Sequence, residues 1–328
     1  MHNYNLRKQL EKKGIIGLIS IRKQAINSLD SVCYETTPTI RGFGNLKEIG
    51  KRYDAIVCGS DQVWNPDVIK PGYSSVEFIT GIHKVAFSPS FGVSEIPEKM
   101  YPRYKAFLDD FSFLSSREES GAKLIYKITG REAQLTADPT LTLKREHWNR
   151  YCEYSKVSIP KEKYIFCYLL GGNEEHRTII KHLQKCSNCK IVSMPHFKGY
   201  VAADSGFADI ELYNVNPADF VKLIANAEYV CTDSFHGTVF SNIFQKKYFV
   251  FERYRNDDKT STNTRIHSLL SVLGTKERLI GSVDELQKIY KVPIDYDEVA
   301  KKMDEIRLQT DKYLEEALFC VRKDVSNV

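Results

Sequence analysis

Residues 216–251 read NPADFVKLIANAEYVCTDSFHGTVFSNIFQKKYFVF, and this stretch decides the fold class. Its pattern predicts, in chain order, helix, strand, helix and strand over 217–226, 228–231, 237–244 and 247–251. Asn216 before Pro217 suits a helix start, because proline fits the first helical position. Strands that are apolar throughout and alternate with helices are typical of a parallel sheet covered on both faces.

The same alternation extends through most of the chain. Further strands are predicted over 54–58, 85–88, 111–114, 134–136, 164–170 and 190–193. Further helices are predicted over 97–109, 118–128, 174–185 and 266–273. A polar stretch over 144–163, broken by Pro160, separates two α/β halves. The sequence therefore predicts an α/β N-terminal domain over 1–150, a C-terminal domain over 160–296, and a long amphipathic helix over 297–322 that packs back on a domain.

Composition excludes several classes of protein. The 328 residues carry 47 Lys+Arg against 42 Asp+Glu, a net charge of +5, and 42% are hydrophobic, as in globular proteins. The basic residues are scattered, so we expect no nucleic-acid partner. No apolar run approaches the roughly 20 residues that a bilayer requires. The charged start MHNYNLRKQLEKKG does not fit a signal peptide, so we expect a cytoplasmic protein.

The eight cysteines do not indicate disulfides or a metal site. Cys58, Cys167 and Cys231 lie inside apolar strand patterns, where we expect small buried hydrophobes. Cys186 and Cys189 have CxxC spacing but no further pair that would complete four zinc ligands. We therefore expect no metal and interpret this pair as two cysteines at a helix end.

Ligands of open parallel sheets bind beyond the carboxyl ends of the strands, so the turns that follow the strands are the candidate sites. Four such turns carry polar side chains, at 59–66, 115–120, 171–173 and 232–237. In the last turn, Ser234 and His236 stand at the start of a helix, which is a favourable place for an anion. Two interpretations stay open: an anion site, or Asp233 and Ser234 as helix caps beside a half-buried His236.

Arg117 and Asp61 follow the ends of two other predicted strands. The planar guanidinium of Arg117 suits a carboxylate or phosphate, but taken alone the residue fits better as a partner of the neighbouring acids Glu118 and Glu119. Asp61 is a candidate base, although aspartate also forms turns.

Several ordered motifs together resemble one known family. They are DAIVCGSDQVWNP, AFSPSFG, FLSSREESG, ADPTLTL, the stretch 216–251, and NTRIHSLLSVLG, which together span roughly residues 53–281. This combination resembles the polysaccharide pyruvyl transferases. The resemblance implies a GT-B-like pair of Rossmann-like domains and a transferase that uses phosphoenolpyruvate as donor, without cofactor or metal. The acceptor would be a sugar diol on a free or lipid-linked surface-polysaccharide precursor, and the products a pyruvate ketal and phosphate. A lipid-linked acceptor would also bring the protein to the membrane surface.

The resemblance also assigns roles to residues. His236 would protonate the donor or bind its phosphate, and Asp61 would accept a proton from the acceptor. The other implied donor contacts are Ser115, Arg117, Ser234, Phe235, Gly237 and Arg265. Trp64 and Asn65 would contact the acceptor.

The chain departs from the family pattern in two places. Some members carry an arginine two residues before the histidine, where this chain has Ser234, and Arg265, Lys246 or Arg253 are candidates to replace it. Members also begin with an apolar strand, which this chain either lacks or carries in diverged form. Two alternatives to pyruvyl transfer stay open: a GT-B glycosyltransferase that uses a sugar nucleotide, and an inactive glycan-binding homologue.

Overall fold

The computed structural model describes residues 40–69, 72–195, 201–254 and 261–325. Their contacts divide into two compact units. Among the described residues, unit 1 comprises Leu143–Arg253 and Thr275–Tyr296, and unit 2 takes the described parts of Thr37–Thr142, Tyr254–Gly274 and Asp297–Val328. The chain thus passes from unit 2 to unit 1 at Leu143, and residues 254–274 group with the earlier part of the chain. The first strand expected from the resemblance falls in residues 1–39, outside the described residues.

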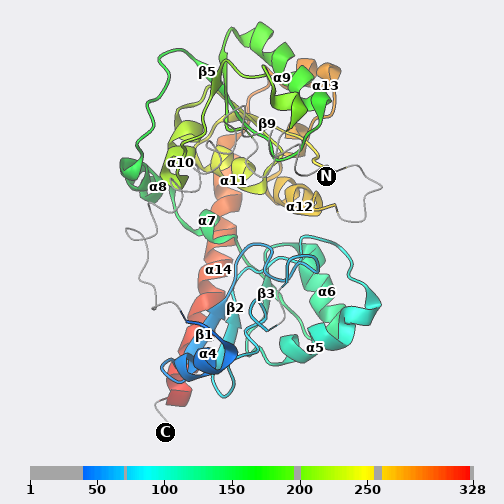
Figure 1. The fold of residues 1–328 in the computed structure, drawn as a ribbon, viewed down its shortest axis with the longest axis vertical. Helices are drawn as coiled ribbons and strands as arrows, with labels where there is room; N and C mark the ends of the chain where they lie inside the picture. Colours follow the sequence, from blue (N-terminus) through cyan, green and yellow to red (C-terminus); the bar gives the residue numbers. More distant parts are fainter. Residues whose placement is uncertain (1–39, 70–71, 196–200, 255–260, 326–328) are drawn as a thin grey trace, which may run out of the picture. The chain divides into compact units, whose positions relative to one another are not determined.

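Unit 1 is built on a parallel five-stranded sheet (Figure 1). Its strands are β5 (Tyr164–Tyr168), β6 (Lys190–Ser193), β7 (Ile210–Glu211), β8 (Tyr229–Thr232) and β9 (Lys247–Val250). They lie in the order β7-β6-β5-β8-β9, and every neighbouring pair is parallel. Counted along the unit this is 3-2-1-4-5, the order of a Rossmann-like sheet. The strand order reverses between β5 and β8, which makes their carboxyl ends the expected ligand site.

The helices of unit 1 are α8 (Arg145–Tyr151), α9 (Glu174–Ser187), α10 (Pro217–Asn226), α11 (Phe235–Ile243) and α13 (Val283–Ile289). Short 3₁₀ turns occupy Cys152–Tyr154, Ala202–Asp204 and Lys276–Arg278. The central strands are buried on both faces, as their continuous apolar pattern predicts. Cys167 of β5 and Cys231 of β8 lie opposite each other in the strand register and are fully buried, which confirms their expected role as small core residues. Residues 144–163, where the sequence predicts a boundary between the two halves, contain α8 and the turn Cys152–Tyr154.

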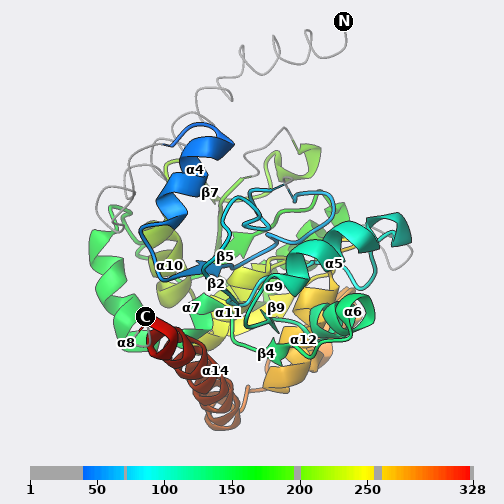
Figure 2. The ribbon, with the colours of Figure 1, turned by 90° about the horizontal axis from the view of Figure 1, so that it is seen from below.

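Unit 2 contains four short parallel strands: β1 (Ala55–Cys58), β2 (His83–Ala86), β3 (Ser115–Ser116) and β4 (Gln134–Leu135). β1 pairs with β2 and β3 with β4, and a bridge between Val85 and Phe113 connects the two pairs. Its helices are α4 (Phe43–Gly50), α5 (Tyr101–Asp109, after the turn Glu98–Met100), α6 (Glu119–Thr129), α7 (Pro139–Thr142) and α12 (Thr264–Leu273). Helices α5 and α6 lie side by side (Figure 2).

The long C-terminal helix, α14 (Tyr296–Val325), packs on the strands of unit 2 (Figure 1). Tyr313 and Ala317 bury against Val85 of β2, and the Tyr313 hydroxyl donates to the Ala86 carbonyl at 2.6 Å. The Ala137 N–H donates to Thr310 Oγ1 at 2.7 Å. The predicted amphipathic helix is confirmed. Within the part of the chain that the structure describes, no helix is both long and apolar enough to cross a membrane.

Candidate functional site

The turn between β8 and α11 holds the residues that the sequence singled out most strongly. Ser234 is the N-cap of α11, and its hydroxyl accepts a hydrogen bond from the Gly237 N–H at 3.4 Å. His236 lies in the first turn of α11, half-buried, with its ring edge-on to Phe235. A Cβ at Gly237 would lie 2.4 Å from Thr232 Oγ1, so glycine allows the helix to approach the strand end this closely. The turn therefore places His236 at the positive end of a helix, at the ligand edge of the sheet.

Asp233 ties this turn to the neighbouring one. Its side chain is completely buried, and its two carboxylate oxygens accept hydrogen bonds from the N–H groups of Leu170 and Gly171, both at 2.7 Å. Leu170 and Gly171 belong to the turn between β5 and α9. The Asp233 carboxylate thus connects the β8–α11 turn to the β5–α9 turn, and these two turns flank the point where the strand order reverses.

Arg253 follows the end of β9 and reaches the same turns. Its Nη2 donates to the Asp233 carbonyl at 2.9 Å and lies 3.7 Å from Asp233 Oδ1. The side chain is 18% exposed. Lys246, the other candidate on this strand, precedes β9 and therefore lies at the amino end of the sheet, where it donates to the Ala225 carbonyl. Burial and the nearby Arg145 and Lys247 lower the pKa of Lys246, against the opposite effect of Glu228. Of these two, only Arg253 lies at the edge of the sheet where a ligand is expected.

His176, in the first turn of α9, was not singled out from the sequence. It is 4% exposed and stacks on Phe251, with ring centroids 4.6 Å apart. Its Nε2 lies 3.2 Å from the Asn173 amide nitrogen. Burial lowers the pKa of His176 to about 4, although Asp233 acts in the opposite direction. His176 is therefore a neutral imidazole at neutral pH, and the only sequence signal for it is its place in the first turn of the helix that follows β5.

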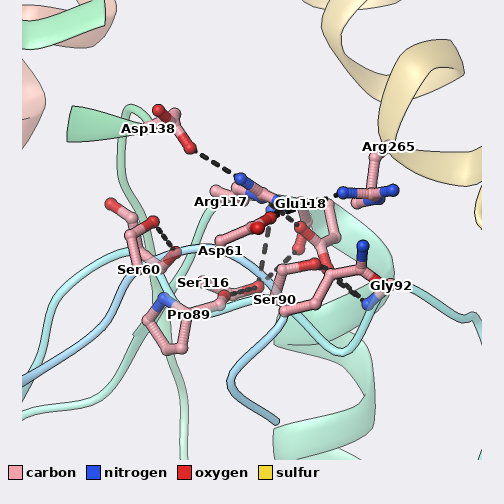
Figure 3. Close-up of polar contacts among 12 residues, drawn as sticks. Ser60, Asp61, Pro89, Ser90, Gly92, Ser116, Arg117, Glu118, Asp138 and Arg265 are labelled. Carbon is pink, nitrogen blue, oxygen red and sulfur yellow. Dashed lines mark hydrogen bonds and ion pairs between the residues drawn. The ribbon is translucent and has the colours of Figure 1, made fainter. Parts of the chain in front are cut away.

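Unit 2 gathers a second set of predicted residues around Arg117 (Figure 3). The Arg117 side chain is 1% exposed, and its Nη1 donates to Asp138 Oδ2 at 2.6 Å. Its Nη2 donates to Asp61 Oδ1 at 2.7 Å, and its Nε lies 3.5 Å from Glu118 Oε2. Burial by itself lowers the pKa of Arg117, but the charges of Asp138, Glu118 and Asp61 raise it above its ordinary value. The guanidinium is thus a buried cation among three carboxylates.

Asp61 is the exposed member of this cluster. Its side chain is 57% exposed, while those of Asp138 and Glu118 are 3% and 1% exposed. The Asp61 backbone is left-handed, with φ of 55°, a conformation that aspartate tolerates better than most residues. Arg265, from α12, reaches the same carboxylate, with its Nη1 3.5 Å from Asp61 Oδ1. Arg117 and Arg265, both predicted donor contacts, therefore both contact Asp61. The predicted pairing of Arg117 with Glu118 is present, but Arg117 also pairs with Asp61 and Asp138.

Two other predicted contact residues are buried, and their hydrogen bonds give them structural roles. Ser115 is fully buried, and its hydroxyl donates to the Ala86 carbonyl and accepts from the Ser88 N–H, which ties neighbouring strands together. Asn65 is 4% exposed, and its Oδ1 accepts from the Asp67 N–H within a turn.

Trp64 has no exposed surface at all. Its ring packs against those of Phe91, Phe107 and Phe111. An indole in this position is a core residue, so the acceptor contact expected for Trp64 does not fit its placement.

The described residues contain no group of three or more His, Cys, Asp or Glu side chains that could hold a metal ion. Cys186 is exposed on the last turn of α9, and Cys189 is buried just before β6.

Comparison with protein families adds to this geometry. The model of a family described as polysaccharide pyruvyl transferase matches residues 1–253. The chain belongs to the polysaccharide pyruvyl transferase family. It is accordingly a transferase that acts in polysaccharide modification, and the β8–α11 turn with His236 lies inside the matched region. No curated protein sequence matches the chain.

Solved structures are similar to the chain in fold. A UDP-GlcNAc 2-epimerase from Neisseria meningitidis bound to UDP-GlcNAc is 11% identical, with a TM-score of 0.53 over 84% of this chain and 79% of that one. A UDP-N-acetylglucosamine 2-epimerase from Rickettsia bellii is 13% identical, with a TM-score of 0.54 over 86% of this chain and 78% of that one. These likenesses, together with the parallel sheets, show an α/β fold that is GT-B-like.

Proposed function

We propose that this pyruvyl transferase family member moves the pyruvyl group of phosphoenolpyruvate to a sugar diol of a surface-polysaccharide precursor, producing a pyruvate ketal and phosphate. The observation that carries the proposal is the position of His236. It lies in the first turn of α11, beside the point of strand reversal in a Rossmann-like sheet. A histidine there can bind an anion or transfer a proton. The reaction of phosphoenolpyruvate requires both anion binding and proton transfer.

The donor side of the proposal is assigned to unit 1. The N-terminus of α11 favours a phosphate or carboxylate, and Ser234 and Gly237 shape this turn. Arg253 lies at the same edge of the sheet and supports the donor site as its cation, in place of the arginine that other members carry two residues before the histidine. A guanidinium suits the carboxylate and phosphate groups of the donor because it can donate two parallel hydrogen bonds.

The acceptor side is assigned to Asp61 of unit 2. Its exposed carboxylate lies 2.7 Å from Arg117 Nη2 and 3.5 Å from Arg265 Nη1, and it can accept a hydrogen bond from a sugar hydroxyl. The buried Trp64, Asn65 and Ser115 are not part of this proposal.

The reaction balances without a cofactor. A proton is added to the methylene carbon of the donor, and one acceptor hydroxyl attacks the adjacent carbon. The bond from that carbon to the phosphate oxygen then breaks, and the second hydroxyl closes the ketal. Of the two hydroxyl protons, one is accounted for by the new methyl group and the other by the released phosphate. His236 is proposed to deliver the first proton or to bind the phosphate, and Asp61 to take up a hydroxyl proton.

The test compares His236→Ala and His236→Gln with wild type, using phosphoenolpyruvate and a panel of free and lipid-linked oligosaccharides. Pyruvyl adducts are detected by mass spectrometry and phosphate release is measured in parallel. We expect His236→Ala to lower turnover by about two or more orders of magnitude, the usual size of a lost general acid. His236→Gln can still donate a hydrogen bond to phosphate but cannot deliver a proton, so its activity separates the two roles. His147→Ala, an exposed histidine on α8, is the matched control.

Two results would overturn the proposal. Transfer of a sugar from a sugar nucleotide, with no pyruvyl adduct from phosphoenolpyruvate, would indicate a glycosyltransferase. Glycan binding without any turnover would indicate an inactive homologue. Normal activity per folded molecule in a destabilised His236→Ala protein would instead reject His236 as the residue responsible.

A further inference from the structure

The side chain of Arg253 lies across the end of β8 in unit 1. Arg253 follows β9, and its Nη2 donates to the carbonyl of Asp233, which follows β8, at 2.9 Å. Its Cγ lies 3.0 Å from the place that a Cβ on Gly171 would occupy, and Gly171 follows β5. Because β8 lies between β5 and β9 in the sheet, the side chain reaches the point where the strand order reverses.

We propose that Gly171 is a positioning residue of the donor site. The absence of a side chain at Gly171 lets Arg253 lie against the β5–α9 turn, with its guanidinium placed for the anionic donor. The inference rests on the proposed function, because it takes Arg253 as the cation that binds phosphoenolpyruvate. It goes further by giving the turn after β5 a part in donor affinity.

The backbone of Gly171 is held on both sides. Its N–H donates to Asp233 Oδ2 at 2.7 Å, and the N–H of Leu170 donates to the other oxygen of the same carboxylate. Its carbonyl accepts from Arg177 Nη1 at 2.8 Å. Arg177 is 4% exposed, and its Nη2 donates to Asp204 Oδ1 at 2.6 Å. Both polar groups of the Gly171 backbone are therefore bound to buried charged side chains, which leaves the turn little freedom to move.

A methyl group at position 171 would therefore displace a neighbouring side chain. Its carbon would lie 3.0 Å from Arg253 Cγ and 3.0 Å from Asp233 Oδ2. Two carbon atoms pack at about 3.5–4.0 Å, so the contact with Arg253 would be too close. Asp233 is completely buried and accepts two backbone hydrogen bonds, whereas Arg253 is 18% exposed. We therefore expect Arg253 to be the side chain that shifts, and its guanidinium to shift with it.

The next residue, Gly172, offers a matched comparison. Among the described residues, the nearest atom to a Cβ on Gly172 would be Val201 Cγ1 at 3.4 Å, an ordinary packing distance. Neither Gly171 nor Gly172 has the left-handed backbone that disfavours other residues. Alanine restricts the unfolded chain in the same way at both positions. The two substitutions therefore differ chiefly in whether the new methyl group contacts Arg253.

The experiment measures phosphoenolpyruvate binding by calorimetry in Gly171→Ala, Gly172→Ala, Arg253→Ala and the Gly171→Ala/Arg253→Ala double variant. Steady-state kinetics with an acceptor that wild type modifies give kcat and the KM for each substrate. Melting temperatures report the folded fraction of every variant. The double variant lacks the Cγ of Arg253, so it removes the close contact that Gly171→Ala creates.

We expect Arg253→Ala to raise the dissociation constant for phosphoenolpyruvate by about tenfold or more, because charge-assisted hydrogen bonds to the donor are lost. Gly171→Ala should raise it by about threefold to tenfold, as a displaced guanidinium would, with the KM for the acceptor within about twofold of wild type. Gly172→Ala should bind the donor within about twofold of wild type. The double variant should bind no more weakly than Arg253→Ala, because Gly171 acts through Arg253.

Wild-type donor binding in Gly171→Ala would overturn the inference, and so would an equal loss in Gly172→Ala or additive losses in the double variant. If Gly171→Ala does not fold alone, a folded double variant would support the contact with Arg253, and an unfolded one would refute it. Wild-type donor binding in Arg253→Ala would overturn the inference but leave the proposed function in place.

A wild-type protein that neither binds phosphoenolpyruvate nor transfers its pyruvyl group would overturn the proposed function and this inference together.

Discussion

The buried His176 predicts a specific acid sensitivity of unit 1. The pKa of this imidazole falls from 6.5 to about 4 on burial in the folded protein. A folded pKa below the unfolded value means that protons bind preferentially to the unfolded chain, so stability is fully present above about pH 6.5 and is lost as the pH falls toward 4. At pH 5 the shift changes the folding equilibrium by about 30-fold, or about 2 kcal/mol, and the whole effect approaches about 3 kcal/mol near pH 4.

The substitution His176→Phe isolates this contribution. Phenylalanine can keep the stacking on Phe251, whose centroid lies 4.6 Å from the His176 ring, but it has no proton to bind. Urea unfolding of wild type and His176→Phe is measured at about pH 7.5 and about pH 5 by circular dichroism. We expect wild type to lose about 2 kcal/mol more stability between the two pH values than the variant loses.

His182 on the same helix provides the control. It is half-buried and its Nε2 lies 3.1 Å from the Gln287 amide nitrogen. His182→Phe is measured in the same way, as the matched substitution of a histidine on α9. An equal loss of stability with acid in wild type and His176→Phe would show that His176 does not titrate as argued, and the reasoning from its burial would fail.

Two further predictions concern buried residues. Asp233→Asn replaces one of the two accepting oxygens with an NH2 group, so the N–H of Leu170 or of Gly171 loses its acceptor, and we expect the change to cost about 3 kcal/mol of stability. A thermal melt would check this, with the exposed Asp284→Asn expected to change stability by less than about 0.5 kcal/mol, and equal melting temperatures for the two variants would contradict the role. Trp64→Phe should cost about 1–3 kcal/mol with unchanged activity per folded molecule, because the indole packs only in the core. A raised KM for the acceptor in this variant, at unchanged stability, would restore the acceptor role.

The strands and helices of unit 1 could be predicted because their patterns are local. The helix Pro217–Asn226 and the strand Lys190–Ser193 have the predicted bounds, since a proline at the first helical position and a short apolar run each mark their own limits. β7 was missed because this strand has only two residues, Ile210 and Glu211, and they do not form an apolar run. α8 was missed because none of its seven residues is buried, so no apolar stripe marks it.

The candidate site was predictable as a set of turns but not as a set of partners. A residue after a strand must lie near the carboxyl edge of the sheet, which locates Ser234, His236 and Asp61 from sequence alone. The pairing of side chains from different turns has no such signal in the sequence. Arg117 and Asp61 are 56 positions apart in the chain, and only the fold brings Arg117 Nη2 to 2.7 Å from Asp61 Oδ1. The sequence therefore singled out Arg117 but could not show which charges surround it.

The charges around Arg117 in unit 2 differ from those around the β8–α11 turn in unit 1. Among the described residues around Arg117, the three carboxylates of Asp61, Glu118 and Asp138 outnumber the guanidinium groups of Arg117 and Arg265. At the β8–α11 turn, the carboxylate of Asp233 is instead engaged by the backbone of the β5 turn, and Arg253 and the positive end of α11 lie at the same edge. The N-terminus of α11 and the guanidinium of Arg253 therefore favour an anion beside His236, and this supports the proposed place of the charged donor in unit 1.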